Sequence, residues 1–143
     1  MPKVSKSALV NFSANDMFEI VDNVALYPEF LPWCGSTKVI SRSSDTLEAS
    51  IEIAHGGINK TFSTRNRMQK GKMIELQLLN GPFHSLHGFW RFDALGENAC
   101  KVSLDLNYEF SSKILGLVVG PVFNKIANTL VDAFCERAGK IYG

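Results

Sequence analysis

The sequence has almost no net charge of either sign. Its 143 residues include 15 lysines and arginines and 14 aspartates and glutamates, which leaves a formal charge of +1. A chain so balanced produces no long-range field that attracts phosphate groups, so its composition argues against binding nucleic acid through overall charge. We therefore expect no DNA partner, and any contact with RNA has to come from a local basic patch.

Cysteines and long apolar runs are also scarce. Cys34, Cys100 and Cys135 are odd in number, none is spaced as C-x-x-C, and the opening MPKVSKSALV does not read as a secretory leader. The longest apolar stretch, residues 114–123, has ten residues, whereas a membrane-spanning helix needs about 20. These absences predict reduced thiols in a cytoplasmic protein.

Phenylalanine, in contrast, is abundant. The chain has 10 phenylalanines against 3 tyrosines and 2 tryptophans, and 45% of its residues are hydrophobic. Phenylalanine has no polar end that needs a partner, so this excess favours a large core or an apolar cavity. The length predicts one domain over residues 1–143, which buries roughly 68–70% of its unfolded surface.

Periodicity predicts the order strand, helix, short helix, six strands and long helix, an α+β fold. Apolar residues alternate over 3–12, and Ser13 followed by Asp16 is a variant capping box that opens a helix over 14–24. The segment YPEFLPWC at 27–34 contains a short helical turn between its two prolines. The remaining elements are strands over 37–42, 47–54, 60–68, 72–79, 84–93 and 101–110 and a helix over 112–139.

Two of these elements show how the core is formed. In strand 101–110 the apolar side chains from Val102 to Phe110 alternate strictly with polar ones, as in an antiparallel sheet with one covered face. The last helix has one apolar face after Pro121, but residues 114–119 are apolar all round. We expect burial of this section under the sheet. The alternatives are that it gates a tunnel or makes transient contact with a membrane surface, although it lacks a basic polar face.

Several motifs together resemble the START-like helix-grip superfamily, and more narrowly the coenzyme-Q-binding START-domain family, also called the RatA or polyketide-cyclase-like family. The motifs are YPEFLPWC at 27–34, FSTRN at 62–66, NGPF at 80–83, GFWRF at 88–92, the run from Tyr108 to Phe123 and LVDAFCERA at 130–138. The resemblance covers almost the whole chain. It implies a curved antiparallel sheet of about seven strands wrapped around the long C-terminal helix, with an apolar tunnel between them and two short helices between strands 1 and 2.

The resemblance also implies two functions. Eukaryotic relatives bind ubiquinone and support respiration, whereas RatA-type members are described as toxins that bind the large ribosomal subunit and block subunit joining. Our main hypothesis is non-enzymatic binding of ubiquinone or a similar isoprenoid lipid, in support of respiration or quinone biosynthesis. Such a protein is expected to be cytoplasmic and to bind peripherally at the inner membrane. The alternative is the ribosome-binding toxin.

The apolar rows of the strands and helix define the residues expected to line the tunnel. They are Phe30, Leu31, Trp33, Phe62, Leu76, Leu78, Phe83, Leu86, Trp90, Leu104, Leu106, Tyr108, Val119, Val122, Phe123, Ile126 and Leu130. A quinone head accepts hydrogen bonds but donates none, so one or two donors near the mouth suffice; Trp33, Lys60, Arg65 or a histidine are candidates. For the alternative function, Lys60, Arg65 and Arg67 are the residues expected to contact RNA.

No constellation of residues predicts catalysis or a metal site. His84 and His87 form an H-x-x-H pattern, but on a strand these positions point to opposite faces. Cys34 has no base at a spacing that would activate it, and Glu48, Glu52, Glu75, Asp105 and Glu109 mostly lie on polar rows. We therefore expect that the protein has no enzymatic activity and binds no cofactor or metal ion. A cyclase-like enzyme stays open as a second alternative, and requires an inward-facing polar pair.

Overall fold

A computed structural model describes residues 3–143 as one antiparallel sheet with helices on its concave side. The seven strands lie in the order β1-β7-β6-β5-β4-β3-β2. The elements are β1 (Lys3–Val10), α1 (Ala14–Asp22), η1 (Val24–Leu26), α2 (Tyr27–Phe30), β2 (Cys34–Arg42), β3 (Thr46–His55), β4 (Ile58–Gln69), β5 (Met73–Asn80), β6 (Phe83–Gly96), β7 (Ala99–Phe110) and α3 (Lys113–Tyr142). Every predicted element is present, and the expected helix-grip fold is confirmed.

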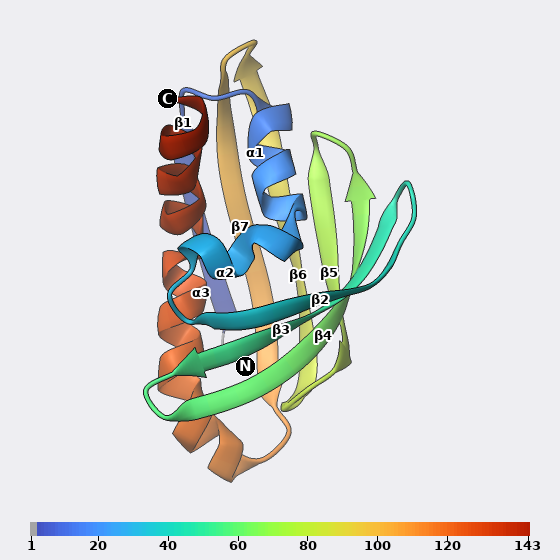
Figure 1. Cartoon of the computed structure of the whole chain (residues 1–143), viewed down its shortest axis with the longest axis vertical. Helices are drawn as coiled ribbons and strands as arrows, with labels where there is room; N and C mark the ends of the chain where they lie inside the picture. The colour runs from blue at the N-terminus through green and yellow to red at the C-terminus, as the bar shows by residue number, and fades with distance from the viewer. Residues whose placement is uncertain (1–2) are drawn as a thin grey trace.

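The sheet curves around one side of α3. In Figure 1, α3 runs along the sheet, α1 and α2 lie beside it over β6 and β7, and β2, β3 and β4 sweep across below them. Both longer helices begin at serine caps: Ser13 Oγ accepts a hydrogen bond from the Asp16 amide at 3.0 Å, and Ser112 Oγ accepts one from the Leu115 amide at 3.1 Å. The helix α3 continues through Pro121.

The register of the strands places the apolar rows on the concave face. Leu104 is opposite Trp90, and Leu106 lies between Val4 on one side and Gly88 on the other. All of these side chains are buried, as are Phe123, Ile126 and Phe134 on the facing side of α3. The core therefore lies between the concave face of the sheet and one face of α3, as the strict alternation in strand 101–110 predicted.

The first turns of α3 differ from the prediction: residues 114–119 were expected to be buried under the sheet, and this expectation is wrong. Ile114, Leu117 and Val118 are 73%, 70% and 58% exposed, and only Val119 is fully buried. These three residues are spaced i, i+3 and i+4, so they share the side of the helix that faces away from the sheet. By length and composition α3 is apolar enough to cross a membrane, because one 18-residue window within it has a mean hydropathy of 1.5, although the same helix supplies the core.

At Gly88 the backbone of β7 leaves no room for a side chain on β6. A Cβ atom built there would lie 2.4 Å from the carbonyl oxygen of Asp105 on β7, whereas one built at Gly96 on the same strand meets nothing within 4 Å. Backbone cannot move aside as a flexible side chain can, so overpacking at Gly88 has to be absorbed by shifting strands.

We predict that Gly88→Ala lowers the free energy of unfolding by about 1–3 kcal/mol or more, and that Gly96→Ala changes it by less than about 1 kcal/mol. Urea denaturation followed by circular dichroism measures both variants. Equal stability of the two would show that β6 and β7 do not approach as closely as described.

Candidate functional site

An apolar cavity lies between the concave face of the sheet and α3. Every element except β1, α1 and β2 contributes to its lining, which consists of Val24, Tyr27, Trp33, Ala49, Ile51, Ile53, Phe62, Thr64, Asn66, Leu76, Leu86, Trp90, Leu104, Leu106, Phe123, Ile126, Ala127, Leu130 and Phe134. None of these side chains carries a charge. The cavity therefore favours neutral and largely apolar occupants.

Two aromatic clusters form part of the cavity wall. In the first, Phe123 packs against Phe83 and Tyr108, with ring centroids 4.9 and 4.7 Å apart, and Phe62 joins them. In the second, the ring of Phe134 lies 5.3 Å from both Tyr27 and Trp90. Apart from the tilted Tyr27–Phe134 pair, these contacts are edge-to-face, a geometry that adds to the stability from area burial.

The cavity is small. The centre of a water molecule has about 80 Å³ in which to move. One water needs roughly 10–15 Å³ on this measure, so the space accommodates a few water-sized groups, comparable with one substituted ring. In this conformation the cavity is too small to enclose a long isoprenoid tail.

Two polar side chains of β4 interrupt the apolar lining. Thr64 and Asn66 are 6% and 7% exposed, and they are the only buried polar or charged residues of 3–143. The hydroxyl of Thr64 donates to Asn66 Oδ1 at 2.8 Å. Neither the Asn66 amide nitrogen nor the Trp90 indole nitrogen has a hydrogen-bond partner within residues 3–143. Ser85 Oγ is the only fully enclosed polar side-chain atom without a partner, so both nitrogens border open space.

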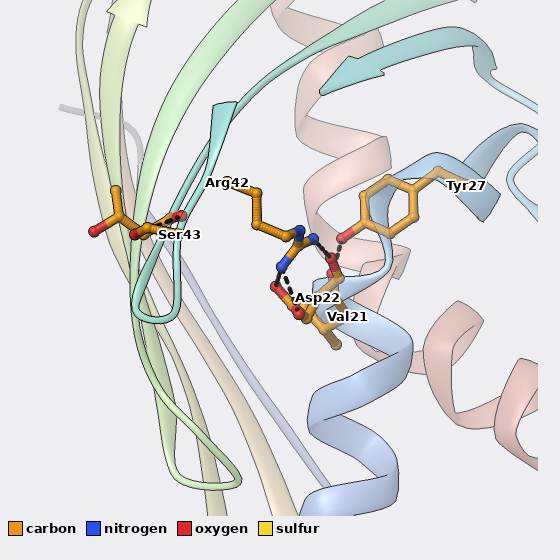
Figure 2. A network of polar contacts seen from close by, with 6 residues as sticks. Val21, Asp22, Tyr27, Arg42 and Ser43 are labelled. Atoms are coloured by element: carbon orange, nitrogen blue, oxygen red, sulfur yellow. Dashed lines mark hydrogen bonds and ion pairs between the residues drawn. The ribbon is translucent and has the colours of Figure 1, made fainter. Parts of the chain in front are cut away.

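Tyr27, in contrast, contributes only its apolar ring to the cavity. Its hydroxyl donates to the carbonyl oxygen of Val21, and burial first, then the carboxylate of Asp22, raises the pKa of this hydroxyl. Figure 2 shows this contact beside Arg42 on β2, whose guanidinium lies 3.0 Å from Asp22 Oδ2. Together these bonds attach the C-terminal end of α1 to β2 and hold Tyr27 over the cavity.

The predicted tunnel residues divide into two groups. Those that line the cavity are Trp33, Phe62, Leu76, Leu86, Trp90, Leu104, Leu106, Phe123, Ile126 and Leu130, whereas Phe30, Leu31, Leu78, Phe83, Tyr108, Val119 and Val122 lie outside its lining. Lining residues not predicted are Val24, Tyr27, Ala49, Ile51, Ile53, Thr64, Asn66, Ala127 and Phe134. Alternation along β4 was the available signal for Thr64 and Asn66, because Phe62 and Met68 share their face.

The candidate donors are not where the sequence suggested. Lys60 is exposed at one end of β4, opposite Ile53, and Arg65 points away from the cavity and pairs with Glu48 at 2.8 Å. Of the donors predicted, only Trp33 is in the lining; Trp90 was predicted to line the tunnel but not to act as a donor, and Asn66 was not predicted. Neither Lys60 nor Arg65 is therefore part of the lining, although Lys60 is on the inward side of β4.

The outer face of the sheet carries a separate polar hollow. It is lined by Asp45, Thr46, Arg65, Arg67, Met68, Gln69, Met73 and Glu75. Lys60 does not belong to it: even-numbered residues of β4 face inward and odd-numbered ones outward, so Lys60 is on the opposite face from Arg65 and Arg67. Lys60, Arg65 and Arg67, the three residues expected to contact RNA, therefore do not form one continuous patch.

The titratable groups near the cavity do not form a catalytic arrangement. Burial raises the pKa of Cys34 to about 11, with a further rise from the carboxylate of Glu52, so its thiol stays protonated at neutral pH. His87 lies 2.8 Å from Glu75 Oε2 on the outer face, and His84 is exposed. Within residues 3–143 no group of three or more metal-binding side chains occurs.

Comparisons with known proteins identify close relatives. Proteins named "Ribosome association toxin RatA" are 47% identical in Vibrio cholerae, over 100% of this chain and 99% of the relative, and 44% identical in Pseudomonas aeruginosa, over 98% and 97%. The Xenopus laevis "Coenzyme Q-binding protein COQ10 homolog B, mitochondrial" is 26% identical, over 97% of this chain and 59% of the relative.

The fold and the sequence agree on the family. A START superfamily protein from Mycobacterium smegmatis superposes with a TM-score of 0.81 at 20% identity, over 97% of this chain and 98% of that one. Residues 10–135 match the family described as "Polyketide cyclase / dehydrase and lipid transport". The chain belongs to this family.

Proposed function

We propose that this protein associates with the ribosome and acts as a toxin of the RatA type on the large subunit. The observation that carries the proposal is the pair of relatives of that name, at 44% and 47% identity over almost the entire length of both chains. Ribosome association, which the sequence analysis gave as the alternative, therefore replaces ubiquinone binding as the main hypothesis. A ribosomal partner also agrees with a cytoplasmic location.

The β4–β5 hairpin is the surface that we assign to ribosomal RNA. Arg67, Lys70 and Lys72 are exposed and form no ion pair within residues 3–143, whereas the neighbouring Arg65 is neutralised by Glu48. Gly71, with a φ of 72°, lets the chain turn between the two lysines. Three free cations on one hairpin suit contacts with phosphates, which a chain of overall charge +1 cannot attract at long range.

Binding of a neutral ligand in the cavity is a second candidate function. It is favoured by the uncharged lining with two buried donors and by the distant relative named as a coenzyme Q-binding protein. A quinone ring matches the size of the cavity, and a longer isoprenoid tail would need the aromatic clusters to separate. Arg67 points to the opposite face of the sheet from the cavity, and Lys70 and Lys72 lie at the hairpin turn outside the cavity lining, so the two functions do not compete.

A non-enzymatic role fits the interior better than a cyclase reaction. General acid–base catalysis needs an inward-facing group that exchanges protons near neutral pH. The buried polar residues of the cavity are Thr64 and Asn66, and neither side chain titrates in that range.

The first test is co-sedimentation of the protein with purified large ribosomal subunits at several salt concentrations. We expect the Arg67→Ala/Lys70→Ala/Lys72→Ala variant to bind more weakly and to reduce the slope of log K against log salt by about two to three, because each lost phosphate contact removes roughly one released ion. Lys60→Ala is the matched control and should bind as the parent does.

The outcomes separate the function from the surface. Binding of the triple variant with unchanged affinity and slope would assign the contact to another part of the molecule. Absence of co-sedimentation of the parent protein, even at low salt, would contradict the proposed function itself.

The second candidate is tested by extracting the protein, purified from a quinone-producing host, with organic solvent and analysing the extract by mass spectrometry. Ligand binding predicts a quinone in stoichiometric amount, absent from an unrelated protein purified in parallel. An empty extract, followed by no change in melting temperature on adding ubiquinone, would count against it.

The pKa of Cys34 generates a prediction about alkaline stability. The folded protein retains this proton up to about pH 11, whereas the unfolded chain loses it near pH 8.5. Folding stability should therefore fall as pH rises between these values, and less steeply in Cys34→Ser. Urea denaturation at pH 8 and pH 10 measures the difference, and parallel losses in both proteins would exclude a contribution from this thiol.

A further inference from the structure

We infer that Asn66, held by Thr64, and Trp90 form a subsite for the carbonyl oxygen of a neutral, single-ring ligand. This inference rests on the second candidate function, binding in the cavity, and adds the chemical group that the cavity selects. It is independent of ribosome association.

The direction of the hydrogen bonds follows from Thr64. Its hydroxyl donates to Asn66 Oδ1 at 2.8 Å, so the acceptor of the Asn66 amide is already engaged. The amide N–H groups remain, and they have no partner within residues 3–143. What the cavity offers at this point is therefore a donor, and the complementary ligand atom is an acceptor.

A second donor lies on the same face of the sheet. Trp90 is 4% exposed, lines the cavity, and its indole N–H also lacks a partner within residues 3–143. Asn66 is opposite Leu76 on β5, while Trp90 is opposite Ile74 of the same strand, so the two donors lie on β4 and β6 with β5 between them. Neither nitrogen is fully enclosed, so both remain open to an acceptor, and an occupant of the cavity with oxygen atoms can satisfy them.

The lining limits the charge and size of this occupant. No lysine, arginine or histidine is present to balance a carboxylate or phosphate, so burying an anion here is unfavourable. The 80 Å³ open to the centre of a water molecule corresponds to about one substituted ring. A quinone or aromatic ketone satisfies both limits, whereas a hydrocarbon ring leaves the donors unpaired.

The experiment compares duroquinone with durene, which has the same ring and the same four methyl groups but no carbonyl oxygens. Binding to the 15N-labelled full chain is measured by NMR titration. Duroquinone should bind roughly three- to tenfold more tightly than durene, the effect of one net hydrogen bond. It should also shift the Asn66 side-chain amide and one of the two tryptophan indole signals, which durene should move less.

Variants test whether Asn66 carries the preference. Asn66→Leu should bind the two probes with equal affinity. Asn59→Leu is the matched control, because Asn59 is exposed on the same strand, and it should keep the parent's preference. If Asn66→Leu does not fold, the Asn66 amide signals of the parent protein give the same answer.

The negative results are distinct. Equal affinity of the parent for duroquinone and durene, with Asn66 signals unmoved by the quinone, would overturn the carbonyl subsite while leaving binding in the cavity intact. Failure of the parent to bind either probe would overturn the subsite together with the cavity's proposed ligand-binding function.

Discussion

The packing of α3 against the concave face of the sheet is the contact on which the rest of the structure depends. A curved antiparallel sheet cannot leave its apolar concave face in water, and no other element is long enough to cover it. Phe123 and Phe134 lie eleven positions apart on α3 and fix its two ends in aromatic clusters. Between them Ala127 on the helix and Ala49 on β3 leave room, and the cavity is the space that remains.

This arrangement gives one strand two different surfaces. Along β4 the side chains of Arg65 and Arg67 point outward, while Asn66 between them points into the cavity. Asn66 on the inner face and the outward-facing Arg67, unpaired within residues 3–143, can therefore contact different partners without interference. The proposed ribosome contact and the proposed ligand subsite depend on adjacent residues, but on opposite sides of the sheet.

Much of the fold could be predicted from the sequence because alternation and helical periodicity report directly which residues share a face. Strand 101–110 and the apolar face of α3 after Pro121 are examples. Periodicity does not tell whether an apolar face finds a partner, and for this reason Ile114, Leu117 and Val118, predicted to be buried, are exposed.

The site was predictable only in part. The apolar rows identified many lining residues, but the position of the cavity depends on where remote aromatic rings meet, which no local pattern records. Lys60 was grouped with Arg65 and Arg67 because all three are basic, although alternation along β4 puts Lys60 on the opposite face of the sheet. The same parity places Thr64 and Asn66 on the inward face. They were not predicted to line the cavity because only apolar residues were selected.

We propose that the β4–β5 hairpin contacts the ribosome while the core around α3 stays closed. Hydrogen exchange with mass spectrometry, on the free protein and on the protein bound to purified large subunits, tests it most directly. We predict slower exchange on binding in residues 65–75 and unchanged exchange in α3. Protection confined to the exposed first turns of α3, at residues 114–118, with none in the hairpin, would contradict the account.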